Sequence, residues 1–415
     1  MKKTYVLICI LMLSFSVFSQ EIQEESIVIN IEVPVRVFKG DVFVDDLNID
    51  DFEVLEDGVP QKIEAVYLIK KRTVERSEEK KRFTPDTQRI FYLFFEITDY
   101  DPKLEKAVDY FIHNVLVQRD NLVVVTPLKT YRMKNNTFEI MPKEKVVEQL
   151  VGLIRKDALI GSSEYNAAIQ ECASCARAIQ ARLLPISREG GGDADSVPVL
   201  DESVGDEFRG MAIEEQVMMY TTLLSKLETL RRVNQKKLLD FADSLKDREG
   251  QKYVFMFYQK EFVPMIDPKI LDQALSRFQD SPSVIQDLTT ISNFYKREVS
   301  FDVDAVKQAY ADSSISIHFL LLTKPPANTY GVHFEEHSED IFAAFNEMAN
   351  ATGGFTESSI NPDFLMRKAV DASENYYLLY YSPKGYTSDG KFREIEVRVK
   401  KSGHRVSHRA GYFAN

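Results

Sequence analysis

Long apolar runs are almost absent from this sequence of 415 residues. The one such run, residues 5–18, follows Lys2 and Lys3 and is shorter than the roughly 20 apolar residues that a membrane-spanning helix needs. A short apolar run behind basic residues is typical of a secretory signal, so we predict a signal peptide over residues 1–19. Cys9 lies inside the run, which disfavours a lipid anchor. We expect the mature chain to be secreted or to lie in the periplasm or cell envelope, without inserting into a membrane.

Cysteine is also scarce, because only Cys172 and Cys175 follow the predicted signal peptide. So few cysteines exclude a disulfide-dense fold. Their Cys-x-x-Cys spacing occurs in redox motifs and zinc half-sites, but redox cysteines lie at a helix N-terminus beside a strand. These two fall within a helical pattern, so we expect a local disulfide or two unreactive thiols.

Basic residues are outnumbered in the chain. There are 52 Lys and Arg against 64 Asp and Glu, and the formal net charge is −12. Removing the two lysines of the predicted signal peptide leaves 50 basic residues against the same 64 acidic ones. A chain with this charge repels phosphate backbones and anionic lipids, so we do not expect nucleic acid among its partners.

Motifs for phosphate binding and for a serine nucleophile are missing: the sequence has no Gly-x-x-x-x-Gly-Lys, Gly-x-Gly-x-x-Gly or Gly-x-Ser-x-Gly. One catalytic pattern is present, because His333, Glu336 and His337 match the His-x-x-Glu-His motif of inverted zinc peptidases. In that motif two histidines hold zinc and the glutamate activates water. Here the motif falls in an expected loop before a helix that starts near Ser338, which disfavours a zinc site. A zinc hydrolase therefore remains only an alternative function, and we assign no catalytic residue.

Alternating apolar residues predict a small β module over residues 20–69. The period of two is found in residues 26–37, 51–56 and 60–68. Asp57 and Gly58 form a hairpin turn signal between the second and third of these segments. Residues 70–81 carry nine charges in twelve positions, which predicts an exposed charged linker over residues 70–86.

The middle of the chain alternates between buried strands and amphipathic helices. Residues 90–97 form a nearly continuous apolar run, as in a strand that is covered on both faces. Further strands are expected over residues 121–128, 252–258, 314–322 and 355–357. Helices are expected over residues 104–115, 143–154, 165–184, 211–247, 303–311, 338–350 and 363–372. This alternation predicts an α/β fold over residues 87–374 with a doubly wound, mostly parallel sheet and an acidic loop insertion at residues 188–210.

Strand signals return in residues 375–415. Residues 376–381 and 392–399 flank a turn at residues 388–390. Because the termini of a domain tend to lie close together, we expect these strands to pair with the N-terminal strands in one small β-sandwich, with the α/β domain inserted in it or flanked by it. Tyrosines at positions 376, 377, 380 and 381 crowd one strand, which favours packing in the core over a recognition surface.

Five segments carry a family resemblance: residues 33–37 (VPVRV), 51–61 (DFEVLEDGVPQ), 376–383 (YYLLYYSP), 390–400 (GKFREIEVRVK) and 409–412 (RAGY). They resemble the acidobacterial-type VWFA-related domain family. The resemblance spans nearly the whole mature chain. It implies an exported protein with a von Willebrand factor A-like domain, which matches the doubly wound, Rossmann-like sheet expected above.

The resemblance also implies a metal site, because von Willebrand A domains often hold a cation at the carboxyl ends of the parallel strands. The first element of that site is Asp-x-Ser-x-Ser, and the equivalent positions here are Glu96, Thr98 and Tyr100. The second element falls at Ser163, and Glu261 follows the strand after which the family has an aspartate. Mg²⁺ tolerates misplaced ligands poorly, whereas Ca²⁺ is more forgiving. The resemblance thus implies a degenerate adhesion site for Mg²⁺ or Ca²⁺ with the candidate ligands Glu96, Thr98, Asp99, Ser163 and Glu261; the alternative is a metal-free loop surface.

These patterns favour binding and adhesion over catalysis. We expect residues 99–103, 161–165 and 259–262 to form the upper rim of the sheet and to engage another protein or an envelope polymer. The candidate partner-binding residues are Tyr100, Asp101, Ser162, Glu164 and Lys260. No cofactor is expected beyond the divalent cation. A purely structural envelope component is the remaining alternative, beside the zinc hydrolase.

Overall fold

The computed structural model describes residues 29–134, 136–183, 208, 210–295, 299, 301–325 and 332–415. The predicted signal peptide lies outside the described residues, and so does the predicted acidic loop except for residues 208 and 210. In the described part of the chain, no helix is long and apolar enough to cross a bilayer.

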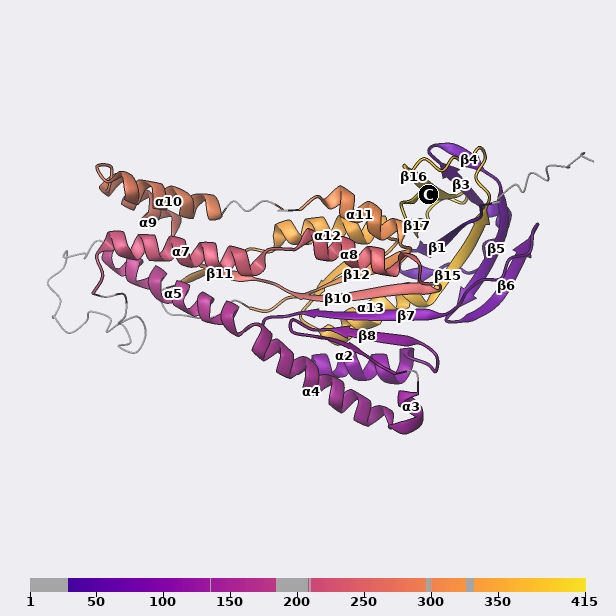
Figure 1. The fold of residues 1–415 in the computed structure, drawn as a ribbon, viewed down its shortest axis with the longest axis horizontal. Helices are drawn as coiled ribbons and strands as arrows, with labels where there is room; N and C mark the ends of the chain where they lie inside the picture. Colours follow the sequence, from indigo (N-terminus) through magenta and orange to yellow (C-terminus); the bar gives the residue numbers. More distant parts are fainter. Residues whose placement is uncertain are drawn as a thin grey trace, which may run out of the picture.

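A six-stranded sheet runs through the middle of the molecule (Figure 1). In spatial order its strands are β14 (Phe355–Ser359), β12 (Ile315–Leu322), β10 (Gln251–Gln259), β7 (Arg89–Glu96), β8 (Asn121–Val125) and β9 (Thr130–Arg132). The strands from β14 to β8 pair in parallel, and β9 pairs antiparallel with β8. All residues of β12 are buried, as expected for an apolar strand between two layers of helices.

Helices cover both faces of this sheet. One face carries α2 (Leu104–Tyr110) with the π-helical turn that continues it (Phe111–Val115), α4 (Lys143–Gly161) and α13 (Pro362–Glu374). The other face carries α8 (Gln235–Lys246), α11 (Val303–Asp312) and α12 (Glu339–Ala351). Successive side chains of a strand point to opposite faces, so Phe91 and Leu93 join the first core and Tyr92 joins the second.

A helical arm extends beyond the carboxyl ends of the parallel strands (Figure 1). It consists of α5 (Ser163–Leu183), α7 (Ile213–Arg231), α9 (Pro268–Arg277), α10 (Pro282–Phe294) and the antiparallel ribbon of β11 (Phe262–Met265) and β13 (His333–Glu336). These elements share an apolar core of their own. The single helix predicted over residues 211–247 is wrong, because Arg232 is extended and Asn234 begins α8, where its side chain accepts a hydrogen bond from the amide of Lys237 at 3.0 Å.

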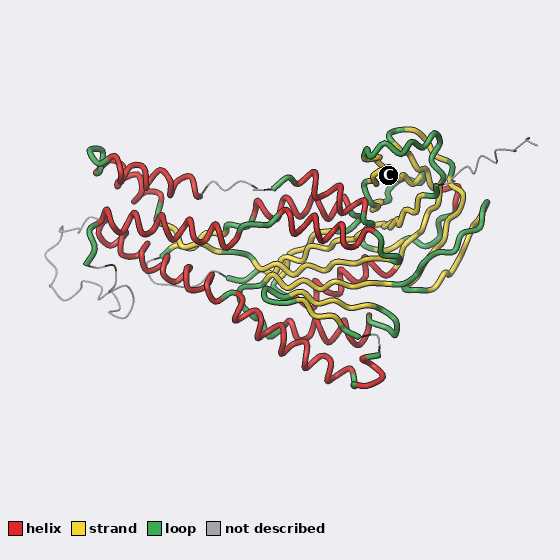
Figure 2. The backbone as a smooth tube through the Cα atoms, viewed as in Figure 1, coloured by secondary structure: helices red, strands yellow, loops and turns green. Residues whose placement is uncertain are grey.

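The two ends of the chain build antiparallel sheets at the opposite end of the molecule (Figures 1 and 2). One sheet contains β1 (Ile31–Lys39), β2 (Val42–Phe43), β5 (Ile63–Lys70), β6 (Thr73–Glu79), β15 (Asn375–Tyr381) and β17 (Arg405–His408). The other contains β3 (Phe52–Glu56), β4 (Val59–Gln61), β16 (Phe392–Val399) and β18 (Gly411–Phe413). β15 pairs with both β1 and β5, and β16 pairs with β3, so strands from both ends interleave. The clustered tyrosines of β15 are buried in this region.

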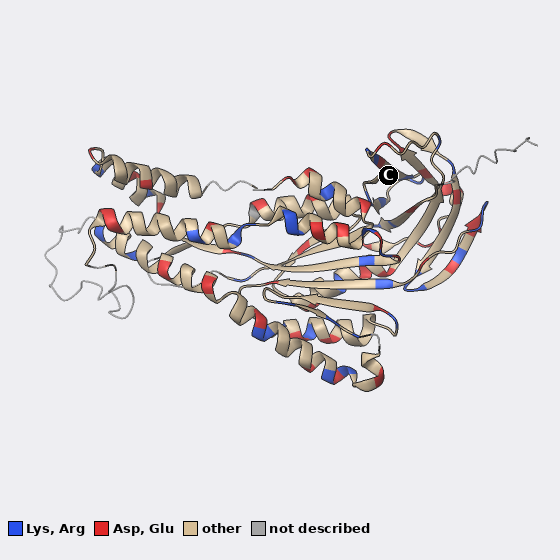
Figure 3. Cartoon of the chain, in the orientation of Figure 1, with Lys and Arg blue, Asp and Glu red and all other residues tan. Residues whose placement is uncertain are grey.

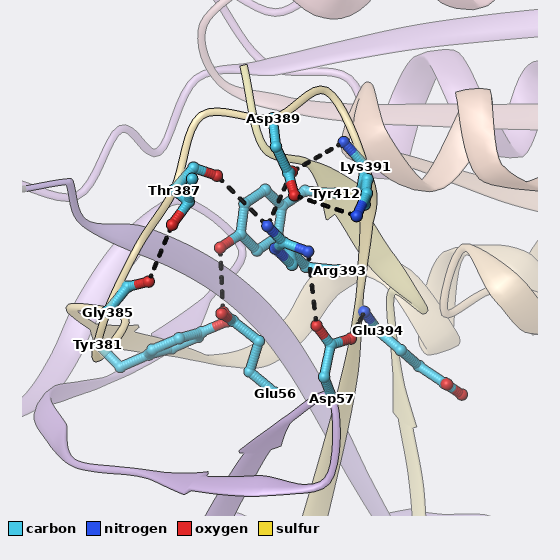
Figure 4. Close-up of polar contacts among 10 residues, drawn as sticks. All are labelled: Glu56, Asp57, Tyr381, Gly385, Thr387, Asp389, Lys391, Arg393, Glu394 and Tyr412. Carbon is cyan, nitrogen blue, oxygen red and sulfur yellow. Dashed lines mark hydrogen bonds and ion pairs between the residues drawn. The ribbon is translucent and has the colours of Figure 1, made fainter.

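A buried carboxylate ties these sheets together (Figure 4). Glu56 accepts hydrogen bonds from the hydroxyls of Tyr381 at 2.7 Å and Tyr412 at 3.0 Å. Beside it, Arg393 donates to Asp389 at 2.8 Å. The hydroxyl donors supply the hydrogen bonds that a buried carboxylate needs, so they fix β3 against strands from the C-terminal end of the chain.

The predicted fold class, a doubly wound and mostly parallel von Willebrand A or Rossmann-like sheet beside a small β-sandwich, is wrong for this chain. Most strands of the described residues are antiparallel and belong to curled sheets, which give a mixed α/β structure (Figure 2). The antiparallel sheet around β15 has six strands, as many as the sheet that contains the parallel pairs. Apolar periodicity predicts which faces are buried, but it does not give the direction of pairing or the number of short flanking strands.

The segment predicted as a linker, residues 70–86, is also corrected. Its residues Thr73–Glu79 form β6, which pairs antiparallel with β5 at the edge of the sheet. Side chains of both charge signs lie along β6 (Figure 3). Charged side chains at an exposed edge disfavour pairing with another chain, so the charge run that suggested a linker belongs to a protected edge strand.

Candidate functional site

A cavity of about 840 Å³ lies on the face of the central sheet that carries α8. Tyr92, Phe94 and Glu96 alternate along β7 and line it from one side of the strand. Register places Val123 and Val125 of β8 beside Tyr92 and Phe94, so the floor of the cavity is a continuous apolar and aromatic surface.

The wall of the cavity comes from α8. The ring of Phe241 packs edge-on against Tyr92 and Phe94, each at a centroid distance of 5.3 Å. Lys237 lies one turn earlier on the same helix and lines the cavity near Glu96. The far side is bounded by β9, whose Thr130 and Arg132 extend the floor past β8.

Glu96 is the carboxylate on the floor of the cavity. It keeps accessible surface because it faces the cavity, while the surrounding protein removes much of its hydration. This burial raises the pKa of Glu96 above its ordinary value, and the positive charge of Lys237 partly opposes the rise. Glu96 is therefore poised to accept a hydrogen bond or to pair with a cation.

A buried ion pair between Arg231 and Glu261 lines the cavity. Arg231, the last residue of α7, donates through Nε to Glu261, and the Tyr258 hydroxyl donates to the same carboxylate. Arg231 also donates to the backbone carbonyl of His337. Burial raises the pKa of Glu261, and the charge of Arg231 lowers it. The Glu261 carboxylate therefore already interacts with Arg231 and Tyr258 within the protein.

Three loops meet beside the cavity through one glutamine, Gln259, which is among the residues that line it. The Oε1 atom of Gln259 accepts hydrogen bonds from the amides of Thr98 and Asp99, both at 2.9 Å, and from the Thr98 hydroxyl at 3.0 Å. Asn166 then donates to the carbonyl oxygen of Thr98 at 3.0 Å and to the Ser162 hydroxyl at 3.2 Å. These bonds join the segments after β7, after β10 and at the start of α5, so the loops form a shared rim.

Four of the five candidate metal ligands, Thr98, Asp99, Ser163 and Glu261, have partners within the protein. Asp99 pairs with Lys324, and the Ser163 hydroxyl donates to the carbonyl oxygen of Ile160 at 2.7 Å. In the described part of the chain, no three His, Cys, Asp or Glu side chains are grouped so that they could hold one metal ion. The residues present therefore do not fit the Mg²⁺ or Ca²⁺ site that the family resemblance implies, and we derive no step that uses a cation.

The candidate partner-binding residues are scattered around the rim. Tyr100 packs against the core on the other face of the sheet, with the Arg155 guanidinium 6.0 Å from its ring centroid. The Ser162 hydroxyl donates to the carbonyl oxygen of Ala158 at 2.6 Å, and Lys260 pairs with Glu336 at 2.5 Å. Glu164 is exposed and Asp101 is partly exposed. Of these five residues, Ser162 lines the cavity.

The zinc motif is not in the loop that the sequence suggested. His333 to Glu336 form the strand β13, where His333 is exposed, whereas His337 is buried and stacks on Phe294 at a centroid distance of 5.3 Å. Positions four apart on an extended chain are separated by about 13 Å, so the two imidazoles lie too far apart to hold one zinc ion as they do on a helix. This geometry does not fit the zinc arrangement.

The two cysteines lie in the core of the helical arm. Cys172 and Cys175 are free thiols, both buried within α5. Burial raises the pKa of Cys172 well above its ordinary value and that of Cys175 to about 12. Both thiols are thus protonated at neutral pH, and a thiolate nucleophile is not available there.

Comparisons with known proteins give no family assignment. No protein-family model matches the chain, and no curated protein matches it. A crystal structure of the human COPII-coat protein Sec24c is similar with a TM-score of 0.24 and 10% sequence identity, over 79% of this chain and 43% of that chain. The chain spans less than half of that protein's chain, and a likeness this weak supports no inference about the site.

Several residues of the cavity were not identified from the sequence. Arg231 and Lys237 line it, although neither belongs to a motif, and Tyr165 was predicted only as the end of the rim segment 161–165. The Tyr165 hydroxyl is buried and has no hydrogen-bond partner among the described residues. Only the pairing of β7 with β10 and the break before α8 bring these side chains together, and neither is visible in local sequence patterns.

Proposed function

We propose that this chain is an exported binding protein that captures a partner, another protein or an envelope polymer, at the cavity between the central sheet and α8. The observation that carries the proposal is the rim, where Gln259, Thr98 and Asn166 join three loops beside the cavity. Pre-organised loops favour binding, because little conformational entropy is lost when a partner docks. The predicted signal peptide and the resemblance to an exported family support the location.

The polar groups described at the cavity favour recognition over reaction chemistry. Glu96 and Lys237 are a carboxylate and a cation that line the same cavity, and the nearby Thr98 hydroxyl donates to Gln259 at 3.0 Å. A contact between a serine and a histidine occurs elsewhere, with Ser373 Oγ 3.0 Å from His318 Nε2. Both of those residues are fully buried beneath α13, where a substrate has no access.

The test uses two neighbouring lysines of α8. Lys237→Gln removes a cation that lines the cavity, whereas Lys236→Gln removes one that is 82% exposed and pairs with Asp240 outside it. Wild-type and variant proteins are incubated with an envelope protein fraction and, separately, with a purified envelope polymer, and capture is quantified. We expect Lys237→Gln to reduce capture about tenfold and Lys236→Gln to leave it unchanged.

Two results would contradict the proposal. Equal capture by both variants would place the binding surface elsewhere on the molecule. An absence of capture by the wild-type protein, in both fractions, would favour a purely structural envelope component instead.

A further inference from the structure

The cavity has an excess of positive charge in a chain whose formal net charge is −12. Five cations line it against the two carboxylates Glu96 and Glu261. The cations are Arg132, Arg231, Arg232, Lys237 and Arg248. Arg231 is paired with Glu261, while the other four make no ion pair within the described part of the chain. Five cations against two carboxylates leave an excess of three positive charges around the cavity, even with Glu96 close to Lys237, and this excess favours a ligand with negative charge.

These cations stand at two places along the floor. Lys237 is close to Glu96 at the carboxyl end of β7. Arg248, which follows the end of α8, and Arg132 of β9 approach Tyr92, where their charges counteract the rise that burial causes in the pKa of Tyr92. Tyr92 and Glu96 are four residues apart on one strand, which corresponds to about 13 Å. The cavity therefore offers two cationic positions at opposite ends of a short groove.

Between these positions the floor is apolar. Phe94 and Val125 are half-buried neighbours in the sheet, and both line the cavity. Partly exposed aromatic and aliphatic side chains between two charged ends match a ligand with an apolar middle.

We infer that the cavity binds an extended acidic peptide segment, with a carboxylate near each end and apolar side chains between them. The inference rests on the proposed function and names the chemistry of the partner. Two carboxylates four residues apart in an extended peptide are separated by the same distance of about 13 Å. Glu96 on the floor opposes a continuous polyanion, but it accepts a hydrogen bond from a peptide amide. A peptide is thereby favoured over a phosphate-rich polymer.

Tyr165 gives a second indication of a ligand. It lines the cavity beside Glu261, and its buried hydroxyl has no acceptor among the described residues. Burial raises the pKa of Tyr165 far above neutrality, so the hydroxyl keeps its proton and remains a donor. A peptide carboxylate or carbonyl at this end of the cavity supplies the acceptor that the hydroxyl lacks.

The test measures binding of a capped peptide Glu-Val-Leu-Val-Glu to the whole protein by titration calorimetry. The same peptide with Gln in place of both Glu residues is the charge control, and inorganic polyphosphate is the polymer control. We expect the acidic peptide to bind at least about tenfold more tightly than its amide counterpart, and polyphosphate to bind more weakly than the peptide.

The variants Lys237→Gln and Arg248→Gln locate the site, with Lys236→Gln as the matched control on α8. Each of the first two should weaken peptide binding about tenfold, and the control should bind as the wild type does. Equal binding of the acidic and amide peptides, or tighter binding of polyphosphate, would overturn the inference. If Lys237→Gln abolishes partner capture while the peptide fails to compete with the partner, the proposed function stands and the acidic-peptide assignment falls.

Discussion

At the scale of single residues, the cavity contains polar groups that folding alone does not satisfy. The buried hydroxyl of Tyr165 has no hydrogen-bond partner within the described residues, and the Glu96 carboxylate is partly desolvated and makes no ion pair at contact distance. The desolvation of each group costs free energy, and no interaction within the described part of the folded protein fully compensates that cost. Costs of this kind are typical of binding sites, because the partner supplies the missing interaction.

Removing the Tyr165 hydroxyl should therefore stabilise the free protein. Tyr165→Phe keeps the ring and deletes a buried donor without a partner. We expect the free energy of unfolding in urea to rise by about 1 kcal/mol, because the unsatisfied group is gone. A loss of 1 kcal/mol or more would mean that the hydroxyl has a partner in the folded state. The same variant should bind the acidic peptide more weakly than the wild type.

The pH dependence of the free energy of unfolding should reveal the raised pKa of Glu96. Burial raises its pKa in the folded state, so the folded protein holds the proton more tightly than the unfolded chain does. As the pH rises from the pKa of the unfolded state, about 4.5, to the higher pKa of the folded state, the free energy of unfolding of the wild type thus decreases. The variant Glu96→Gln does not show this decrease, because the glutamine amide does not titrate.

We expect the stability difference between Glu96→Gln and the wild type to shift in favour of the variant as the pH is raised from 4 to 7. Urea unfolding at several pH values measures this difference, and Glu148→Gln on the exposed surface of α4 is the control. A difference that stays constant with pH would show that Glu96 is solvated as an ordinary surface carboxylate.

At the scale of elements, the break between α7 and α8 positions the cavity wall. Asn234 ends an extended segment, and its side chain caps α8 by accepting from the amide of Lys237 at 3.0 Å. This cap sets where α8 starts and therefore where Lys237 and Phe241 stand over the sheet.

Loss of that cap should affect both stability and binding. We expect Asn234→Ala to lower the free energy of unfolding by about 1 kcal/mol, whereas Asn234→Asp should retain most of it because aspartate caps equally well. Chemical unfolding and peptide titration of both variants measure these effects. If the alanine and aspartate variants behave alike, the side chain does not fix the start of α8.

Elements with a strong local pattern were predicted from the sequence, and elements defined by distant partners were not. Continuous apolar runs located β7, β10 and β12, and helical spacing located α4 and α5. β6 was missed because its charges are those of a linker, and its strand conformation depends on pairing with β5. β13 was missed for the same reason, since it is a strand only through β11.

The candidate site was predicted in part. The loops after β7 and β10 and the start of α5 do meet, as parallel strands require of their carboxyl ends. The role of their carboxylates was not predictable, because Lys324 and Arg231 come from distant parts of the chain to neutralise Asp99 and Glu261. The cationic lining of the cavity was not predictable either, because its lysine and arginines also come from segments that are far apart in the sequence.

At the scale of the whole molecule, one C-terminal strand joins the two ends of the chain. β15 lies between β1 and β5, and its side chains enter the cores on both faces of that sheet. The antiparallel sheets therefore cannot assemble until the C-terminal segment has been made, although they begin with N-terminal residues.

A charge in the middle of β15 should unfold the antiparallel end. Leu379 is fully buried between two strands from the N-terminal end of the chain, so Leu379→Asp places an unpaired carboxylate in an apolar core. We expect loss of cooperative unfolding and rapid proteolysis. Glu396→Asp, an exposed change on β16, is the control. Retention of the wild-type melting temperature by Leu379→Asp would contradict the central position of β15.

The most direct measurement of the binding site is photo-cross-linking from the cavity floor. A photoreactive benzoylphenylalanine replaces Thr130, an exposed residue of β9 that lines the cavity, or Ile140, which is 73% exposed away from it. Both proteins are irradiated with the envelope fraction, with and without excess acidic peptide. We expect a cross-linked partner from position 130 that the peptide displaces, and none from position 140. Equal cross-linking from both positions, or no product from position 130, would contradict a binding site in this cavity.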